Sequence, residues 1–318
     1  MAEKWLQNHR EVIFGVISSR IDQLQQALLR IRFSTDWKVI TVFIGANDLC
    51  ASCTDSNYFS AVSYTNHIRE ALDMLHKEVP RAFVNLVEVL DILPLREGVL
   101  DSRVNCPTFL TKMLCPCVLS YNEDSHEMRV VKDANLGYQQ SLLQLIDSGR
   151  YDTKDDFTVV LQPFFRHTRI PYLQNGVPDV TYLAPDCFHP SQKAHAQLAR
   201  MLWNNMLEPV GQKSDTMDFE ANISLKCPTQ AQPFLRTYKN SNYNYPIVTT
   251  PAPITNWGSD MECRNFDAVS NSVPTSAHKL RPGDVRVVAA LGDSLTAGFG
   301  ARATSVLNVA TEWRGISW

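Results

Sequence analysis

Apolar and polar positions follow two alternating patterns along much of the chain. Four segments carry apolar side chains at helical spacing, and they span residues 17–33, 64–77, 127–148 and 191–206. Four short apolar runs rich in β-branched residues are typical of buried strands, and they span residues 39–44, 82–89, 156–162 and 285–291. This alternation predicts a three-layer α/β domain with a mostly parallel sheet.

A stretch in the second half of the chain differs in composition and periodicity. From residue 209 to 283 the periodicity is weak, and Pro, Asn, Thr and Ser dominate. Such a stretch is unusual inside a compact domain, so we interpret it as an interdomain linker that wraps a surface. The expected organisation is an N-terminal helical segment (1–33), a domain body (34–208), this linker (209–283), and a final strand and turn (284–318).

The overall composition changes this picture little. The chain has 318 residues, of which 44% are hydrophobic and 20% charged, with a formal net charge of -3. No basic stripe is present, so we expect no nucleic-acid partner. No apolar run reaches the roughly 18 residues that a membrane span needs. The N-terminal residues mix charges into their apolar positions, unlike the apolar core of a signal peptide.

The cysteines point to an oxidising compartment. They are Cys50, Cys53, Cys106, Cys115, Cys117, Cys187, Cys227 and Cys263. An even number in loop-like stretches favours a disulfide framework, with free thiols and a zinc site as the alternatives. Asn222 begins a glycosylation sequon, which points the same way. We therefore expect a protein of the secretory pathway whose signal and anchor lie outside this chain.

The first segment with candidate catalytic residues follows the last apolar run, residues 285–291. The sequence LGDSLTAG follows this strand directly and places Ser294 at the turn. A strand end followed by a glycine-rich turn suits a nucleophilic serine, because the hydroxyl is exposed and flanking N–H groups can stabilise an oxyanion. The alternative interpretation is that this segment is an ordinary turn without a catalytic role. A serine hydroxyl is a weak nucleophile at neutral pH, so this reading requires a base elsewhere in the chain.

Two other segments supply the partners that such a serine needs. Asp186 precedes His189 by three residues, so its carboxylate can orient the imidazole and leave Nε2 available for the serine proton. The sequence GAND follows the first strand, and the Asn47 amide can donate to the oxyanion together with the backbone N–H of Ser294. The alternative for the segment with Asp186 and His189 is a capped helix start, and the alternative for GAND is an ordinary loop. All three segments fall where the ends of parallel strands converge.

These blocks resemble the SGNH/GDSL hydrolase superfamily, which has a flavodoxin-like α/β/α fold. The segments DWKVITVFIGANDLC, APDCFHPSQKAHAQLA and LGDSLTAG, with EWRGISW after the last, resemble the phospholipase B repeats of that superfamily. The resemblance implies Ser294 as nucleophile, His189 as base, Asp186 as its orienter and Asn47 as oxyanion donor. It also implies hydrolysis of phospholipid, lysophospholipid and related lipid esters at membrane or micelle surfaces, without a metal or another cofactor. The parent protein would act at the extracellular face of the plasma membrane.

The order of the blocks departs from the family pattern. In the family GDSL comes first, whereas here it follows His189 by about a hundred residues, and Ser18 and Ser19 stand where a glycine block is expected. We interpret the chain as the body of one repeat, a linker and the opening of a neighbouring repeat. Either the last strand docks beside strand 39–44, as in a circular permutation, and completes an active site, or the chain is a non-catalytic module.

Three further polar residues have simpler readings. His195, on the helix after His189, is interpreted as a solvated helix residue rather than a second base or a metal ligand. Asp48 is expected to cap or orient its loop. Asp293 is expected to bond nearby backbone N–H groups.

Overall fold

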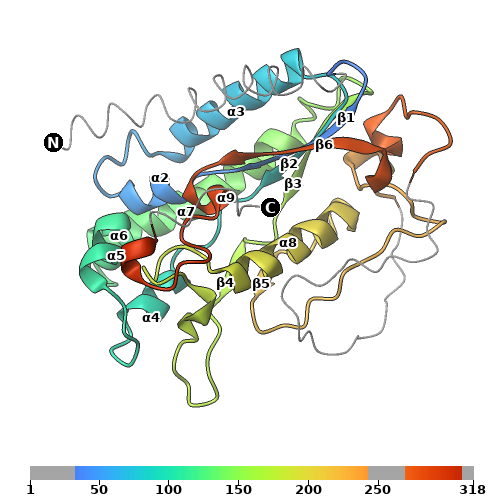
Figure 1. The fold of residues 1–318 in the computed structure, drawn as a ribbon. Coiled ribbons are helices and arrows are strands. Elements are labelled where there is room, and N and C mark those ends of the chain that lie inside the picture. The colour runs from blue at the N-terminus through green and yellow to red at the C-terminus, as the bar shows by residue number, and fades with distance from the viewer. Residues whose placement is uncertain (1–32, 243–268, 310–318) are drawn as a thin grey trace.

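A four-stranded parallel sheet forms the centre of the protein (Figure 1). The computed structural model describes residues 33–242 and 269–309. The strands are β1 (Trp37–Phe43), β2 (Ala82–Val87), β3 (Phe157–Gln162) and β6 (Val285–Gly292), in the order β3-β2-β1-β6. The parallel α/β class is therefore confirmed, and each predicted strand is present within a few residues of its expected limits. The helix predicted at 17–33 lies almost wholly outside the described residues, as do Ser18, Ser19 and Cys263.

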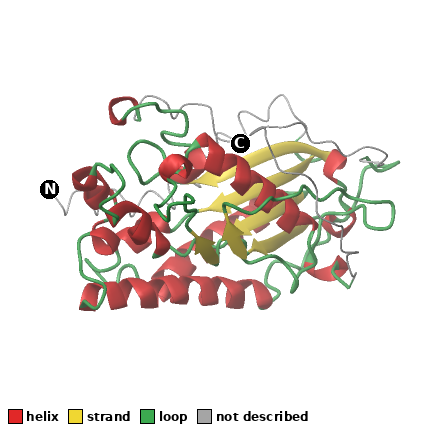
Figure 2. Cartoon of the chain, turned by 90° about the horizontal axis from the view of Figure 1, so that it is seen from below, coloured by secondary structure: helices red, strands yellow, loops and turns green. Residues whose placement is uncertain are grey.

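Helices cover both faces of the sheet (Figure 2). The α-helices are α2 (Ala46–Ala51), α3 (Ala61–Glu78), α4 (Pro94–Leu100), α5 (Thr108–Leu114), α6 (Pro116–Leu119), α7 (His126–Asp147), α8 (Gln192–Leu207) and α9 (Ser294–Ala297). Short 3-10 turns are η2 (Val180–Tyr182), η3 (Tyr238–Asn240), η4 (Ala277–Lys279), η5 (Pro282–Asp284) and η6 (Val306–Asn308). The three long helices α3, α7 and α8 are those that the apolar periodicity predicts.

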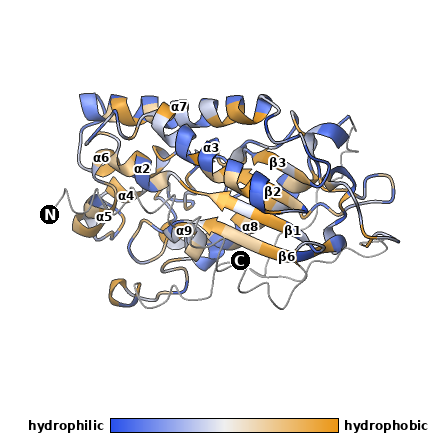
Figure 3. Ribbon diagram, turned by 90° about the horizontal axis from the view of Figure 1, so that it is seen from above, coloured by the Kyte–Doolittle hydropathy of each residue, from blue (hydrophilic) through white to orange (hydrophobic). Residues whose placement is uncertain are grey.

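Alternation along the strands divides the core into two layers. On β1, Ile40 and Val42 pack in the cluster that contains α3 and α7, whereas Val39 and Phe43 face clusters that contain α8. Because successive side chains on a strand point to opposite faces, a strand buried on both sides is largely apolar, although β1 also contains the buried polar residues Lys38 and Thr41. All seven residues of β1 are buried. Figure 3 shows these strands as largely hydrophobic and the outer surface of α7 as mixed.

The strand β6 joins the sheet although it lies more than 200 residues after β1 in the sequence. It pairs with β1 in parallel, with Val42 opposite Leu291 and Phe43 opposite Gly292 (Figure 1). A Cβ at Gly292 would lie 2.1 Å from the Phe43 carbonyl oxygen. Only glycine therefore allows the two strand ends to approach this closely. The position of β6 beside β1 is the one that we expected if the last strand completes an active site.

The segments expected to be linker and loop carry some structure of their own. In the Pro-rich loop after β3, strand β4 (His167–Arg169) pairs in parallel with β5 (Thr216–Asp218), which lies within the expected linker. Leu235 and Leu280, from the same expected linker, are buried against Trp37 at the start of β1. The described parts of this segment therefore contribute to the core. Among residues 33–242 and 269–309, no helix has the length and apolar character needed to cross a bilayer.

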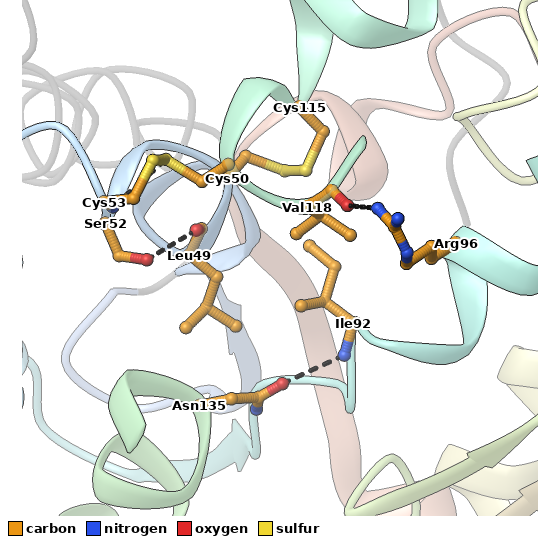
Figure 4. Close-up of a disulfide and its surroundings, with 10 residues drawn as sticks. Leu49, Cys50, Ser52, Cys53, Ile92, Arg96, Cys115, Val118 and Asn135 are labelled. Carbon is orange, nitrogen blue, oxygen red and sulfur yellow. Dashed lines mark hydrogen bonds between the residues drawn. A yellow bond between two sulfur atoms is a disulfide. The ribbon is translucent and has the colours of Figure 1, made fainter. Parts of the chain in front are cut away.

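Three disulfides hold the Cys-rich excursion, which contains α4, α5 and α6, against the rest of the domain. They join Cys50 to Cys115, Cys53 to Cys117 and Cys106 to Cys187. Figure 4 shows the first of them above Leu49, with Arg96 donating a 2.7 Å hydrogen bond to the Val118 carbonyl oxygen. Cys227 is also disulfide-bonded. The prediction of disulfides is confirmed, and the zinc alternative is wrong for these cysteines because their sulfur atoms are paired.

We expect Gly292→Ala to destabilise the protein strongly, because the added methyl group collides with the Phe43 backbone. Overpacking of this kind costs about 1–3 kcal/mol or more, and here it acts on the pairing of β6 with β1. Urea unfolding measures the loss. Val288→Ala on the same strand is the control, since Val288 is 75% exposed. Equal stability of the Gly292 variant and the wild type would contradict this account of the strand contact.

Candidate active site

Three segments meet where the carboxyl ends of β1 and β6 lie side by side. The turn after β6 carries Ser294, the loop after β1 carries Asn47, and the turn before α8 carries Asp186 and His189. Parallel strands bring their carboxyl ends to one edge of a sheet, which is where α/β proteins place ligand sites. The sheet therefore gathers residues that are up to about 250 positions apart in the sequence.

A chain of two hydrogen bonds links the serine, the histidine and the aspartate. Ser294 Oγ lies 2.9 Å from His189 Nε2, and His189 Nδ1 lies 2.6 Å from Asp186 Oδ2. Asp186 is 1% exposed and His189 is 3% exposed, so the bond between them is shielded from water, whereas the bond to Ser294 is part-buried. This is the arrangement in which an imidazole can accept a serine proton while a carboxylate stabilises the resulting positive charge.

A tight turn holds Asp186 and His189 in this relation. The backbone N–H groups of Phe188 and His189 each donate to Asp186 Oδ1 at 3.0 Å, and Ala184 N donates to the His189 carbonyl oxygen at 2.7 Å. Cys187, between them, has a positive φ of 52°. Burial alone would raise the pKa of Asp186. The hydrogen bond and charge of His189, with the two N–H donors, outweigh burial and lower that pKa below its ordinary value.

The turn after β6 fixes Ser294 at the first position of α9. Asp293 caps this helix, since its Oδ1 accepts from Leu295 N at 2.9 Å, as expected from the sequence. Thr296 Oγ1 donates to the Phe43 carbonyl oxygen at 3.2 Å and ties α9 to the end of β1. Gly298 ends the helix in the left-handed conformation, with φ 69°. The serine hydroxyl is thus positioned by contacts on both sides of it.

Aromatic rings enclose the imidazole. The ring centroid of Phe299 lies 4.6 Å from that of His189, and Phe188 contacts it edge-on at 4.9 Å. His195 lies on α8 one turn into the helix, and burial together with the charge of His189 lowers its pKa to about 4. The expectation of a solvated His195 was wrong in part, because the side chain is half-buried and its Nε2 atom is buried.

The loop after β1 presents Asn47 at the surface of the site. Asn47 is the second residue of α2 and is exposed. Gly45 precedes this helix with φ 124°, and a Cβ there would lie 2.8 Å from the Tyr64 ring. Tyr64 also donates to the Ile44 carbonyl oxygen at 3.0 Å. Tyr64 therefore packs closely against the start of the loop, which leaves room only for glycine at position 45.

Two half-buried carboxyl groups lie in the segments that follow β1 and β6. Burial, and then the negative charge of Asp293, raises the pKa of Asp48 to about 7. Burial likewise raises the pKa of Asp293 to about 6, although Leu295 N–H stabilises its charged form. The Oδ2 atom of Asp293 is buried without a hydrogen-bond partner. The sequence indicated that Asp293 bonds nearby backbone N–H groups, but it did not show that the charge of Asp293 raises the pKa of Asp48.

An apolar cavity lies beside the three segments. Its empty volume is about 930 Å³, including space open to solvent. Ala46, Phe188 and Leu295 line it, and each is adjacent in the sequence to one of Asn47, His189 and Ser294. No sequence pattern indicated this cavity, because its wall comes from segments spread over the whole described chain.

Comparison with known proteins assigns the family. The model of the GDSL-like Lipase/Acylhydrolase family matches residues 8–202. The chain therefore belongs to this family. The match contains Asn47, Asp186 and His189 and ends before Ser294, which agrees with the displaced position of the GDSL motif in this sequence. No solved structure matches the chain significantly.

Curated relatives share almost the whole chain. It is 55% identical over 289 residues to "Phospholipase B1, membrane-associated" of Mus musculus, covering 91% of this chain and 19% of that protein. It is 52% identical over 305 residues to the Homo sapiens protein of the same name, covering 95% and 21%. The chain thus spans about a fifth of the length of these relatives. The second match is long enough to include the positions of both His189 and Ser294.

We expect the contribution of Asp48 to the free energy of unfolding to fall as the pH rises from about 4 to above 7. The folded state keeps a proton on Asp48 that the unfolded chain releases at the ordinary carboxyl pKa. The stabilisation that this proton gives to the folded state is therefore lost as the pH rises through the pKa of Asp48 in the folded protein. The free energy of unfolding should change less between pH 5 and 8 in Asp48→Asn than in the wild type, by about 1–2 kcal/mol.

Urea unfolding at several pH values measures this difference. Asp133→Asn on α7 is the matched control, because Asp133 is exposed. Parallel pH profiles of the wild type and the Asp48 variant would show that Asp48 is not protonated in the folded protein near neutral pH.

Proposed function

We propose that this chain hydrolyses acyl esters of phospholipids and lysophospholipids, and related lipid esters, through an acyl-enzyme on Ser294. The observation that carries the proposal is the contact of Ser294 Oγ with His189 Nε2 at 2.9 Å, backed by Asp186 at 2.6 Å. Membership of the GDSL-like Lipase/Acylhydrolase family supports the reaction class. The names of the phospholipase B1 relatives support the substrate class.

The proposed reaction has two steps. His189 Nε2 accepts the proton of Ser294 as its Oγ attacks the ester carbonyl carbon, and the imidazolium that forms is stabilised by Asp186. The tetrahedral oxyanion is stabilised by the Asn47 amide and the backbone N–H of Ser294. His189 then protonates the leaving alcohol, the ester bond breaks, and the acyl group remains on Ser294. A water molecule, deprotonated by His189, releases the fatty acid and restores the serine.

The alternative of a non-catalytic module finds less support. That reading requires Ser294 to serve a site outside this chain, yet its hydroxyl lies in hydrogen-bond contact with His189. The packing of β6 on β1 also makes Ser294 part of the same domain body. Because the relatives are about five times as long as this chain, we also propose that neighbouring repeats flank it in a longer protein.

The setting that we propose is the extracellular face of a membrane, reached through the secretory pathway. The relatives are named membrane-associated. The disulfides suit an oxidising compartment, and Asn222, the candidate glycosylation site, is exposed. Lipid esters at a membrane or micelle surface would then be the substrates that the site encounters.

A fluorophosphonate probe should label Ser294 of the purified chain, and hydrolysis of a lysophosphatidylcholine should accompany labelling. Ser294→Ala should abolish labelling. His189→Ala should reduce both labelling and hydrolysis by a factor on the order of 10⁴ or more, because the serine then lacks its base. His126→Ala, at the start of α7, is the matched control. Labelling that persists in the His189 variant would overturn the assigned base.

A further inference from the structure

Two short segments beside the site expose large apolar side chains. In α5, Phe109 and Met113 are 80% and 63% exposed, and in η6 Leu307 is 95% exposed. Phe109 and Met113 are four residues apart on a helix, so their side chains lie on one face of α5. Single exposed apolar residues are ordinary in proteins, whereas several that gather on one surface indicate contact with a partner or a membrane.

Both segments are attached to the turn that carries the base. Cys106 is bridged to Cys187, with the two Cα atoms 5.7 Å apart, so α5 begins beside this turn. On the other side of the turn, Gln192 N donates to the Ala301 carbonyl oxygen at 2.8 Å. The exposed apolar residues follow Cys106 and Ala301 by three to seven positions. They therefore flank the site, at the end of the molecule toward which β6 points (Figure 1).

The charged residues in these segments are all cations. Residues 104–119 contain Lys112, residues 294–309 contain Arg302, and neither range contains Asp or Glu. Both cations are exposed. The two segments are thus positively charged, although the whole chain has a net charge of -3. Exposed apolar side chains beside basic ones are typical of proteins that bind the surface of an anionic membrane.

We propose that residues 104–114 and 298–309, here called the rim surface, bind the surface of an anionic phospholipid bilayer. This inference rests on the proposed function, because it concerns the lipid surface in which the substrates lie. The exposed apolar side chains of the rim surface enter the boundary between headgroups and acyl chains, and Lys112 and Arg302 contact lipid phosphates. The bridge between α5 and the catalytic turn limits how far this part of the rim surface can move from the site.

The charge and the position of the rim surface favour a bilayer over a second copy of the chain. A symmetric contact between two copies would place the same cations, Lys112 and Arg302, close to each other, and like charges repel. A bilayer that contains anionic lipids supplies the opposite charge. The rim surface also lies on both sides of the site. A protein bound there would block the approach to Ser294, whereas a bilayer bound there presents its ester groups to the serine.

Vesicle binding tests the proposal. The Ser294→Ala variant, which leaves the lipid intact, should cosediment with mixed vesicles of phosphatidylcholine and phosphatidylserine. Phe109→Ser with Leu307→Ser, added to it, should weaken this binding by about tenfold, because their apolar area no longer enters the bilayer. Leu136→Ser with Val273→Ser is the matched control, because these exposed apolar residues lie on α7 and in the segment before β6. Urea unfolding checks that each variant is folded. Equal binding of the rim variant and the control would overturn the proposal.

The charge of the lipid supplies a second test. Lys112→Gln with Arg302→Gln should weaken binding to the mixed vesicles by about tenfold and change binding to phosphatidylcholine alone by less than about twofold. High salt should reduce this difference, since it screens exposed charges. Lys77→Gln with Lys279→Gln is the control at the opposite edge of the sheet, because Lys77 precedes β2 and Lys279 precedes β6. The same loss in both double variants would show that net charge alone determines binding and would overturn the assigned surface.

Hydrolysis separates this inference from the proposed function. With Ser294 present, Phe109→Ser with Leu307→Ser should lower the ratio of the hydrolysis rate of vesicle phosphatidylcholine to that of a water-soluble butyryl ester by about tenfold. Vesicle binding without hydrolysis of either ester by the wild type would refute the proposed function and retain the rim surface. Hydrolysis of both esters with an unchanged ratio and unchanged vesicle binding would refute the rim surface and retain the hydrolase. Light scattering that shows a dimeric wild type and a monomeric rim variant would assign the surface to a second copy and overturn the bilayer.

Discussion

The parallel pairing of β6 with β1 is the contact on which the candidate site depends. Backbone hydrogen bonds set its register, with Phe43 opposite Gly292. The absence of a side chain at Gly292 then lets the two strand ends approach each other. Because both strands run in the same direction, the loops that follow them emerge at the same edge of the sheet. Ser294 reaches the imidazole through this pairing and not through any contact that is local in the sequence.

The disulfides extend this organisation to the surrounding loops. All three described bridges end in the excursion between residues 106 and 117. From there they lead to Cys50 and Cys53 near the loop after β1, and to Cys187 in the turn that carries the base. A crosslink mainly restricts the unfolded chain, but it also limits how far the joined segments can separate in the folded state. The Cys-rich excursion is thus tied to two of the three segments that form the site.

The carboxyl groups at the site differ in how well neighbouring groups compensate their charge. Asp186 is buried yet ionised, because His189 and two backbone N–H groups compensate its charge, and its pKa is lowered. Asp48 and Asp293 are half-buried with fewer hydrogen-bond partners, and loss of hydration raises their pKa values to about 7 and 6. The same residue type therefore has opposite behaviour within one site, and the number of hydrogen-bond donors decides which form is favoured.

The sequence by itself determined the elements and the identity of the reacting groups. Apolar periodicity located the three described long helices and the four strands of the main sheet, because burial on one or both faces imposes a pattern of residues on each element. The spacing of Asp186 and His189, and the turn after the last strand, indicated the chemistry, because those relations are local. The tertiary structure alone decided the remaining features. They are the docking of β6 beside β1, the disulfide partners, the partial burial of His195 and the apolar cavity. Each of these arises from contacts between residues far apart in the chain, for which no local pattern exists.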